Sequence, residues 1–493
     1  MTTTAIQYET IIGLEVHAQL LTRSKMFCPC SASYADSSPN THVCPICLGM
    51  PGVLPVINKR AVEMTIMTGL ALNCEVPEQA KFDRKNYPYP DLMKGYQISE
   101  FDQPLCTGGW LEVEPDGQRR QIGITRVHLE EDTAKLIHVN SPAGETYSLV
   151  DVNRSGVPLM EVVSEPDMRT PEEARAYLVK LRQILRYLDV CAGNMEEGNF
   201  RCDANVSLRP MGDSELGSKV EVKNMNSFRS VYRALNYEVE RQRQILDDGG
   251  RIPQETRGWL DDQGATASQR SKEYANDYRY FPEPDLPPIL VDRQWLDEIR
   301  AQMPELPDAK RARFQAEYGL SQYDVSLLAE TRAKADYFEA TVILAPEAKR
   351  QTRAKAVANW INSDLAGLLN SRNMEIGEAK ITPKTLSQLI DLQEDGAISG
   401  KTAKSVFEEM FASGREPKQI VAEAGLTQIT AGDEIAAAVE RVLESNAKAA
   451  DDYRSGKEEA IKFLVGQVMR ETRGRANPGI VTQLLKEKLR GSP

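Results

Sequence analysis

The first 290 residues contain stretches in which apolar and polar side chains alternate, and this alternation constrains the fold more than any other feature. In residues 11–20, IIGLEVHAQL, the apolar side chains fall on one side of an extended chain, while Glu15 and His17 fall on the other. Residues 200–209 and 219–224 repeat this pattern. The sequence therefore predicts a sheet with an apolar back and a polar front.

The predicted polar front carries acids, cations, an amide and an imidazole together. Besides Glu15 and His17, its members are Arg201, Asp203, Asn205, Lys219, Glu221 and Lys223. Carboxylate and amide oxygens are hard ligands that suit Mg²⁺, and Arg and Lys bind phosphoryl oxygens. The pattern favours a site for a divalent cation and phosphates, with an ordinary solvated face of mixed charge as the alternative.

Two further segments place acids on or beside such strands. TRVHLEEDTAK carries Glu130, Glu131 and Asp132, and the alternation slips by one register just before them. Such a slip indicates a β-bulge, which re-aims a side chain. Glu161 is a single acid in an apolar strand, so it must be paired, metal-bound or protonated, because burying a bare carboxylate is costly.

The spacing of apolar residues along the sequence changes near residue 292. Beyond it, helical periodicity replaces alternation, in short amphipathic units that end at Gly or Asn. We therefore predict an α+β fold with three parts, a sheet domain at residues 1–292, a helical domain at 293–345 and a helical tail at 346–493.

Two helix starts are predicted from local signals. Thr170, followed by Pro171 and Glu173, is typical of an N-cap with a capping box. The stretch GAISGKT, residues 396–402, is similar to a phosphate-binding loop but is one residue short, and no apolar strand precedes it. We interpret Gly400 as the start of a helix.

The charge balance separates the tail from the rest of the chain. The net charge of −12 argues against a protein that coats nucleic acid, yet it is compatible with a local basic patch. From Arg454 onward, nine Lys or Arg stand against four Glu. This tail is either a solvated helical surface or a footprint for a phosphate backbone.

The sequence favours a cytoplasmic protein that does not enter a membrane. No apolar run approaches the roughly 20 residues of a membrane span. The N-terminus, MTTTAIQYETIIG, lacks the basic and apolar regions of a secretory signal.

Four of the eight cysteines cluster as Cys-x-Cys, thirteen residues and Cys-x-x-Cys, and they are Cys28, Cys30, Cys44 and Cys47. Four thiolates on two tight turns suit tetrahedral Zn²⁺, and a closed shell of four ligands is structural rather than reactive. Free thiols in turns are the alternative, and His42 in the same loop is an alternative ligand. The remaining cysteines are expected to be small buried apolar groups.

In several long motifs the chain resembles the B subunit of the tRNA-dependent amidotransferase. These motifs are IGLEVHAQL, KFDRKNYPYPDLMKGYQISEFDQP, HLEEDTAKL, VNRSGVPLMEVVSEPD, EEGNFRCDANVSLRP, YRYFPEPDLPP and FLVGQVMRETRGRANP. The resemblance runs nearly from end to end. It implies a kinase-like cradle domain with an antiparallel sheet, an all-helical middle domain and a small helical tail that contacts tRNA.

The resemblance also implies a heterotrimer, in which a glutaminase A subunit releases ammonia and a small C subunit supports the pair. The B subunit is expected to be part of an ATP-dependent carbon–nitrogen ligase. It phosphorylates the side-chain carboxylate of mischarged Glu-tRNA(Gln), Asp-tRNA(Asn) or both, and ammonia then displaces phosphate to give Gln-tRNA or Asn-tRNA. The implied cofactors are ATP, Mg²⁺ and structural Zn²⁺.

Roles for individual residues follow from the resemblance. The implied Mg²⁺ ligands are Glu15, His17, Glu131 and Glu161, with Glu130 as the alternative to Glu131. From the residue types on the predicted polar front, and not from the resemblance, we assign phosphate binding to Arg201, Lys219 and Lys223, and orientation of the substrate or of a second cation to Asp203 and Asn205. The implied ammonia route consists of Lys81, Asp83, Lys85, Asn86 and Tyr87. The implied tRNA contacts are Arg470, Arg473 and Arg475.

Two other functions fit the same residues. One is a non-catalytic, zinc-containing subunit that binds tRNA and whose polar front is merely solvated. The other is a metallohydrolase that uses Glu15 and His17 and needs no ATP.

Overall fold

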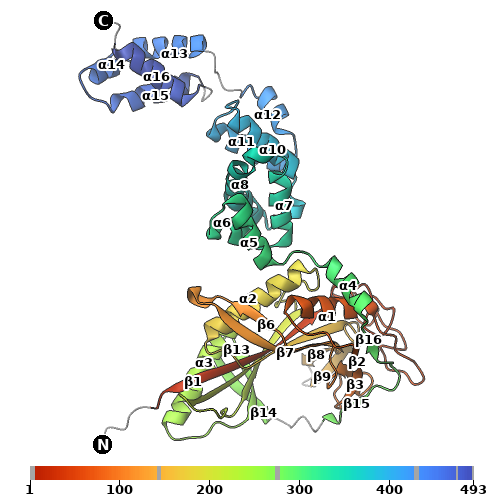
Figure 1. Ribbon diagram of the computed structural model, residues 1–493. Coiled ribbons are helices and arrows are strands. Elements are labelled where there is room, and N and C mark those ends of the chain that lie inside the picture. Colours follow the sequence, from red (N-terminus) through yellow and green to blue (C-terminus); the bar gives the residue numbers. More distant parts are fainter. Residues whose placement is uncertain (1–5, 141–145, 272–277, 427–431, 473–475, 491–493) are drawn as a thin grey trace, which may run out of the picture. The chain divides into compact units, whose positions relative to one another are not determined.

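A twelve-stranded sheet is the framework of the N-terminal part of the chain (Figure 1). The computed structural model describes residues 6–140, 146–271, 278–426, 432–472 and 476–490.

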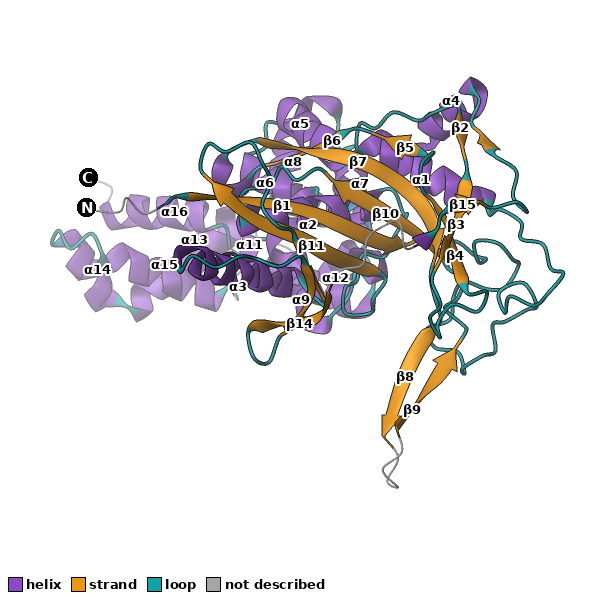
Figure 2. Cartoon of the chain, turned by 90° about the horizontal axis from the view of Figure 1, so that it is seen from below, coloured by secondary structure: helices purple, strands orange, loops and turns teal. Residues whose placement is uncertain are grey.

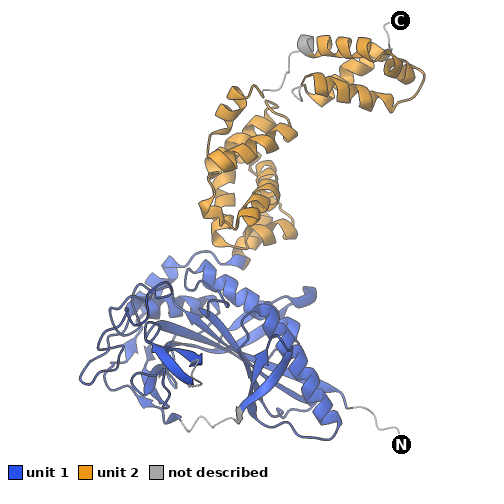
Figure 3. Ribbon diagram, turned by 180° about the vertical axis from the view of Figure 1, so that it is seen from behind, with its two compact units in different colours: residues 1–307 blue, residues 308–493 orange. Residues whose placement is uncertain are grey.

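The chain forms two compact units, residues 1–307 and residues 308–493 (Figure 3). The first contains the sheet and the helices that cover it, and the second is helical. The predicted α+β class, with the sheet region first and helices after it, is thus confirmed. The finer division at residues 292 and 345 stays a prediction.

The main strands pair in an order unlike their order in the sequence. Across the sheet they are β14 (Ala265–Ser271), β13 (Glu255–Leu260), β12 (Val220–Lys223), β11 (Phe200–Pro210), β1 (Tyr8–Gln19), β10 (Pro158–Ser164), β7 (Arg120–Glu131), β4 (Tyr96–Glu100), β3 (Phe82–Asn86) and β15 (Phe281–Pro282). Two further strands also pair with β7, namely β5 (Cys106–Thr107) and β6 (Trp110–Val113). The pairs are antiparallel except β12 with β13, which are parallel and are connected by a helix, as a parallel pair requires.

Two short ribbons lie outside this sheet. One pairs β2 (Gln79–Ala80) with β16 (Ile289–Leu290). The other is the hairpin of β8 (Lys135–Asn140) and β9 (Thr146–Asp151), which projects away from the main sheet (Figure 2).

The apolar back of the sheet packs against helices. These are α1 (Lys59–Ala71), α2 (Pro171–Tyr187) and α3 (Phe228–Asp247), and α4 (Arg293–Gln302) packs on α1. Ile12, Leu14 and Val16 of β1 are buried in one core with Tyr177 and Leu181 of α2. The predicted alternation in β1 is therefore confirmed, and each such buried side chain contributes about 1.5–3 kcal/mol.

The start of α2 matches its sequence signal closely. The Thr170 hydroxyl accepts a hydrogen bond from the N–H of Glu173 at 3.1 Å. The Glu173 carboxylate accepts from the N–H of Arg169 at 2.6 Å, one residue before the position that a capping box predicts. The N-cap at Thr170 is confirmed, and the reciprocal bond is displaced by one residue.

The predicted slip before Glu130 is a β-bulge in β7. Arg126 pairs with Val163 of β10, but Ile124 pairs with Ser164, so Thr125 is an extra residue on the β7 side. After the bulge, alternate residues of β7 point to the polar front again.

The second unit is built of helices. They are α5 (Pro307–Tyr318), α6 (Gln322–Leu328), α7 (Arg332–Val342), α8 (Arg350–Asn359), a π-helical turn (Trp360–Leu365), α9 (Ala366–Arg372), α10 (Pro383–Glu394), α11 (Gly400–Ser413), α12 (Pro417–Glu423), α13 (Gly432–Ser445), α14 (Ala447–Arg454), α15 (Ala460–Glu471) and α16 (Pro478–Arg490). Its buried apolar residues form two clusters, one from α5 to α12 and one from α13 to α16. The predicted helix start at Gly400 is confirmed, with the Ser399 hydroxyl accepting from the N–H of Thr402 at 3.2 Å.

None of the helices in the described part of the chain combines the length and the apolar character that crossing a membrane requires.

Gly69 of α1 leaves no room for a side chain. A Cβ there would lie 2.3 Å from Sγ and 2.8 Å from Cβ of Cys106, which is buried in β5. We expect Gly69→Ala to lower the free energy of unfolding of the first unit by about 1–3 kcal/mol, as overpacking of a core does. Urea denaturation followed by circular dichroism measures the change.

A matched control is Gly367→Ala in α9, where nothing lies within 4 Å of the added methyl group. This variant should be neutral or more stable by up to about 1 kcal/mol, because Ala favours a helix more than Gly does. A urea midpoint for Gly69→Ala equal to that of the wild type would contradict the packing described for α1.

Candidate active site

A cavity of about 340 Å³ opens on the polar front of the sheet. Side chains from seven strands line it, and they come from segments far apart in the sequence. Its charged lining consists of Glu15, His17, Lys85, Glu100, Arg126, His128, Glu130, Glu161, Asp203, Glu221 and Lys223.

The register of three strand pairs aligns four polar residues in one row. His17 of β1 lies opposite Glu161 of β10 on one side and opposite Arg201 of β11 on the other. Glu161 in turn lies opposite His128 of β7. Directly opposite residues in antiparallel strands have Cβ atoms about 4.5–5.5 Å apart, so the backbone itself brings these side chains together.

His17, Glu130 and Glu161 form what we call the acid–imidazole group, whose potential ligand atoms all lie within 4.8 Å of one another. His17 Nε2 is 3.5 Å from Glu161 Oε2 and 3.8 Å from Glu130 Oε1. His128 Nε2 approaches the same oxygen of Glu161 at 3.3 Å from the other side.

The donor set of the acid–imidazole group fits a divalent cation. Two carboxylates suit Mg²⁺, whereas an imidazole is a ligand that Mn²⁺ or Zn²⁺ accepts more readily. His128 contacts Glu161 without belonging to the group, as a residue that orients a ligand does.

The charges in this group depend on one another. Burial alone lowers the pKa of His17, but the carboxylates of Glu161 and then Glu130 outweigh burial and raise this pKa to about 9. Burial likewise opposes ionisation of Glu161, yet the imidazoles of His128 and His17 hold its pKa well below the usual range. A cation that enters the group must therefore displace the proton on His17.

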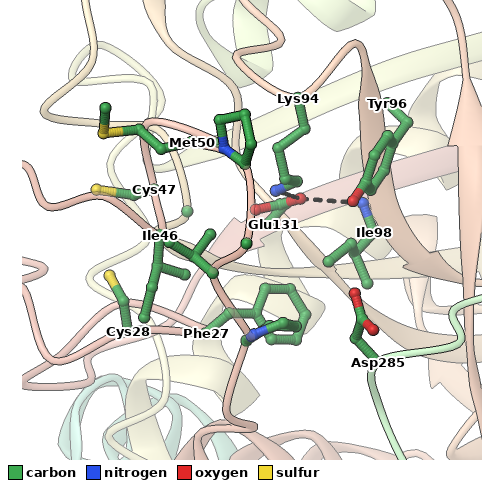
Figure 4. A pocket seen from close by; sticks show the side chains of 16 residues that line it. Phe27, Cys28, Ile46, Cys47, Met50, Lys94, Tyr96, Ile98, Glu131 and Asp285 are labelled. Carbon is green, nitrogen blue, oxygen red and sulfur yellow. Dashed lines mark hydrogen bonds and ion pairs between the residues drawn. The ribbon is translucent and has the colours of Figure 1, made fainter.

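Glu131 points away from this cavity, although its neighbour Glu130 points into it. Glu131 accepts a hydrogen bond from the N–H of Ile98 at 3.0 Å and forms an ion pair with Lys94. Figure 4 shows this pair in a second cavity, of about 230 Å³. Of the two acids left open by the sequence, the structure brings Glu130, and not Glu131, to His17 and Glu161.

Glu15 and its neighbours form a second part of the same cavity. Glu15 Oε1 accepts a hydrogen bond from Asn205 Nδ2 at 2.8 Å. Lys223 Nζ lies 2.7 Å from Asp203 Oδ2 and 3.4 Å from Glu221 Oε1. Burial lowers the pKa of Lys223, but these two acids more than compensate and raise it. Lys223 is thus a charged ammonium that lines the same cavity as the acid–imidazole group.

The other two predicted phosphate ligands lie at the margin. Arg201 donates a hydrogen bond to Asp132 at 3.2 Å and does not line the cavity. Lys219 is exposed and lines an adjacent pocket, which also includes Glu15 and Asn205.

Strand β3 and the residues directly before and after it carry the side chains that the resemblance assigns to ammonia. Lys85 lines the cavity, and its Nζ lies 5.1 Å and 5.8 Å from the ring centroids of Tyr278 and Tyr87. Lys81 pairs with Asp83 at 2.6 Å, away from the cavity lining. The amide of Asn86 donates to two backbone carbonyls. A role of these residues in carrying ammonia stays a prediction.

Lys85 forms no ion pair with any residue that the structure describes. Burial lowers the pKa of Lys85, but the negative charge of Glu130, with a smaller effect from Glu161, raises it overall. Lys85 therefore holds a positive charge between aromatic rings and the acid–imidazole group.

Glu100, at the end of β4, is a buried carboxyl that lines the cavity. Its Oε2 accepts hydrogen bonds from the N–H groups of Leu105 at 3.1 Å and Leu129 at 3.0 Å. Its Oε1 has no hydrogen-bond partner among the described residues. Burial raises the pKa of Glu100 to about 8.

The four clustered cysteines meet as predicted. Their sulfur atoms lie within 4.8 Å of one another. The Cys47 sulfur accepts a hydrogen bond from the N–H of Cys44 at 3.2 Å, and interaction with the neighbouring Cys28 thiol lowers the pKa of Cys47 and raises that of Cys28. A thiolate is the form that binds zinc, so the set fits a tetrahedral ion. His42, the alternative ligand, lies with Nε2 3.1 Å from the hydroxyl of Ser37.

One predicted tRNA contact, Arg470, is exposed at the end of α15. The other two, Arg473 and Arg475, lie outside the described residues.

Comparison with known proteins gives a consistent result over the whole chain. A family model described as the GatB/GatE catalytic domain matches residues 10–297, and one described as the GatB domain matches residues 336–489. The chain belongs to the GatB family. Its relatives include two proteins that are each named as the B subunit of an aspartyl/glutamyl-tRNA(Asn/Gln) amidotransferase. The protein from Thermomicrobium roseum is 58% identical over 484 residues, and the one from Carboxydothermus hydrogenoformans is 56% identical over 483; each match covers 98% of this chain and 99% of the relative.

The GatB assignment confirms the resemblance seen in the motifs. Arg126 and His128 line the cavity although neither was a predicted site residue, whereas Glu130 was predicted as the alternative to Glu131. Arg126, His128 and Glu130 alternate with buried Val127 and Leu129, so the alternation itself could have placed all three on the polar front.

Zinc in this GatB family member can be tested through Cys47. We expect about one zinc ion per wild-type chain and a loss of most of it in Cys47→Ser, because one of four ligands is removed. Metal analysis by mass spectrometry after dialysis gives the content. Cys74→Ser, which changes a buried thiol outside the cluster, should keep its zinc. Wild-type protein without zinc would contradict the assignment.

The buried Glu100 carboxyl predicts a pH dependence of stability. Its pKa in the folded chain, about 8, lies above the ordinary 4.5. The neutral carboxyl therefore stabilises the fold fully below about pH 4.5, and this contribution is lost as the pH rises through about 8. A Gln side chain cannot ionise. As the pH rises from about 4.5 to about 8, we therefore expect the free energy of unfolding of Glu100→Gln to fall by about 1–4 kcal/mol less than that of the wild type.

Urea midpoints of both proteins measured across this pH window give the comparison. Glu112→Gln, which changes an exposed acid of β6, should follow the wild type. Parallel pH profiles of Glu100→Gln and wild type would show that Glu100 is not buried as a neutral acid.

Proposed function

We propose that this chain is the subunit of a multi-subunit amidotransferase that activates and amidates an amino acid attached to tRNA. The substrate is Glu-tRNA(Gln), Asp-tRNA(Asn) or both, and the overall reaction is that of an ATP-dependent carbon–nitrogen ligase. Support comes from the names of the relatives, whose lengths the chain matches almost completely.

The observation that carries the proposal is the cavity in which the acid–imidazole group meets Lys85 and Lys223. Phosphoryl transfer depends mainly on positioning and on neutralisation of charge, and it requires no nucleophile from the protein. Two ammonium groups beside two carboxylates supply an environment of this kind. Mg²⁺ held by His17, Glu130 and Glu161 would add neutralisation of the phosphate charge.

The proposed chemistry has two steps. An oxygen of the side-chain carboxylate attacks the γ-phosphorus of ATP, and ADP leaves. Ammonia then attacks the carbonyl carbon of the acyl phosphate, inorganic phosphate leaves, and the nitrogen loses a proton to give the amide. Lys85 and Lys223 would hold phosphoryl oxygens. Asp203, which pairs with Lys223, and Asn205, which donates to Glu15, would orient the substrate or a second cation.

The remaining parts of the chain have proposed roles in the same assembly. Ammonia comes from a glutaminase A subunit, and a small C subunit completes the heterotrimer in the cytoplasm. The cysteine cluster holds structural Zn²⁺, and the basic tail near Arg470 contacts tRNA.

Glu161→Gln tests the role of the cavity. The change removes one negative charge and keeps the shape of the side chain. In the assembled enzyme we expect kcat for ATP-dependent amidation to fall at least about 100-fold, a size typical for loss of a charged group that stabilises a transition state. Release of ADP and formation of amidated tRNA are measured together, and tRNA binding is measured separately.

Glu112→Gln, which changes an exposed acid of β6 outside the cavity lining, is the matched control and should keep full activity. Full activity of Glu161→Gln would favour a non-catalytic subunit that binds tRNA. Product formation by the wild type without ATP would favour a metallohydrolase instead.

A further inference from the structure

Two aromatic rings in the lining of the cavity stack on each other. Phe101 directly follows β4, and Tyr280 directly precedes β15, so segments far apart in the sequence supply them. Their ring centroids are 4.0 Å apart and their planes differ by 7°. Both side chains line the cavity that contains the acid–imidazole group.

The stacked pair is accessible to a ligand. The Phe101 side chain is 40% exposed even though Tyr280 covers one face of its ring. An exposed aromatic ring beside a strongly polar cavity gains nothing from water, but it offers a flat apolar surface to a partner.

The aromatic surface continues toward the charged part of the cavity. Tyr278 meets Tyr280 edge to face at 6.2 Å, and it meets Tyr87 in the same way at 5.7 Å. Lys85 Nζ lies over the rings of Tyr278 and Tyr87. A flat ligand on Phe101 would therefore have a lysine ammonium between it and the carboxylates.

We propose that the Phe101–Tyr280 pair is a platform on which the adenine ring of a substrate stacks, with the phosphates of that substrate held nearer to Lys85. The proposal rests on the proposed function, since both substrates of that reaction carry adenine. One is ATP, and the other is tRNA, which ends in an adenosine that carries the amino acid.

The platform suits a base for physical reasons. Stacking on an aromatic side chain contributes about 1–3 kcal/mol per base and needs no hydrogen-bond readout. The two rings are already parallel, so little side-chain freedom is lost when a third ring adds to the stack. The neighbouring ammonium complements phosphates that are attached to the base through ribose.

Phe101→Leu in the assembled enzyme is the test. This change keeps an apolar side chain of similar size and removes the ring. The matched control is Phe281→Leu, because Phe281 is 45% exposed and adjacent to Tyr280 but does not line the cavity. KM for ATP, KM for charged tRNA and kcat are measured for both variants and for the wild type.

The two sources of adenine give different results. If ATP occupies the platform, Phe101→Leu raises KM for ATP about tenfold or more and leaves KM for tRNA unchanged. If the end of tRNA occupies the platform, Phe101→Leu raises KM for charged tRNA and leaves KM for ATP unchanged. Phe101→Trp, which enlarges the ring, should keep the wild-type KM in either case.

A binding readout separates stacking from catalysis. ATP or tRNA with 2-aminopurine in place of the relevant adenine should lose fluorescence on binding to the wild type, because stacking quenches this base. Phe101→Leu should abolish the quenching, and Phe281→Leu should keep it.

The platform is refuted if wild-type enzyme is active and Phe101→Leu leaves both KM values within twofold. Equal effects of Phe101→Leu and Phe281→Leu, with a lower melting temperature in both, would show that the stack only joins two segments. An inactive wild-type enzyme would instead contradict the proposed function, so the two failures are distinguishable.

Discussion

The pairing of β1 with its two neighbours is the constraint on which the candidate site depends. It sets His17 opposite Glu161 and Arg201 and sets Glu15 opposite Asp203. A slip of one residue would turn every side chain of β1 to the other face. The apolar residues of β1 prevent such a slip, because it would expose the buried back of the strand to the polar front. Burial of the apolar residues of β1 thus fixes the register of the strand, and the register in turn fixes the positions of the polar side chains on the opposite face.

The polar front brings many charged side chains together in a partly buried cavity. The pairing of opposite charges there lowers the free-energy cost of burying them. An unpaired ion in such a position costs several kcal/mol, while opposite charges at contact distance offset much of that cost. Glu161 lies between two imidazoles, and Lys223 lies between two acids. Lys85 differs, because aromatic faces rather than a carboxylate lie next to it. An anionic ligand would supply the ion pair at contact distance that Lys85 lacks among the described residues.

Local signals in the sequence were sufficient for much of the fold. Alternation in β1, the N-cap at Thr170 and the helix start at Gly400 each depend on a few neighbouring residues, and the structure confirms all three. The bulge at Thr125 was also visible, as a slip in the pattern of apolar residues.

Features that depend on contacts between distant segments were harder to predict. Alternation along β7 is enough to turn Glu130 to the polar front, but the contacts of Glu131 with Lys94 and with the N–H of Ile98 involve β4 and the residues before it, which the local pattern does not reveal. The burial of Glu100 depends on strands and loops that pack around it, and an acid at a strand end gives no sign of this. The Phe101–Tyr280 stack joins two loops, for which no periodic pattern exists.

The central place of β1 in the sheet has a consequence for synthesis of the protein. This strand leaves the ribosome before its neighbours, of which one ends at Ser164 and the other at Pro210. At about 5–20 residues per second, the second neighbour is completed roughly 10–40 s later. During that time β1 cannot pair with both of its neighbours, and its apolar side and unpaired edges are the kind of surface through which nascent chains aggregate.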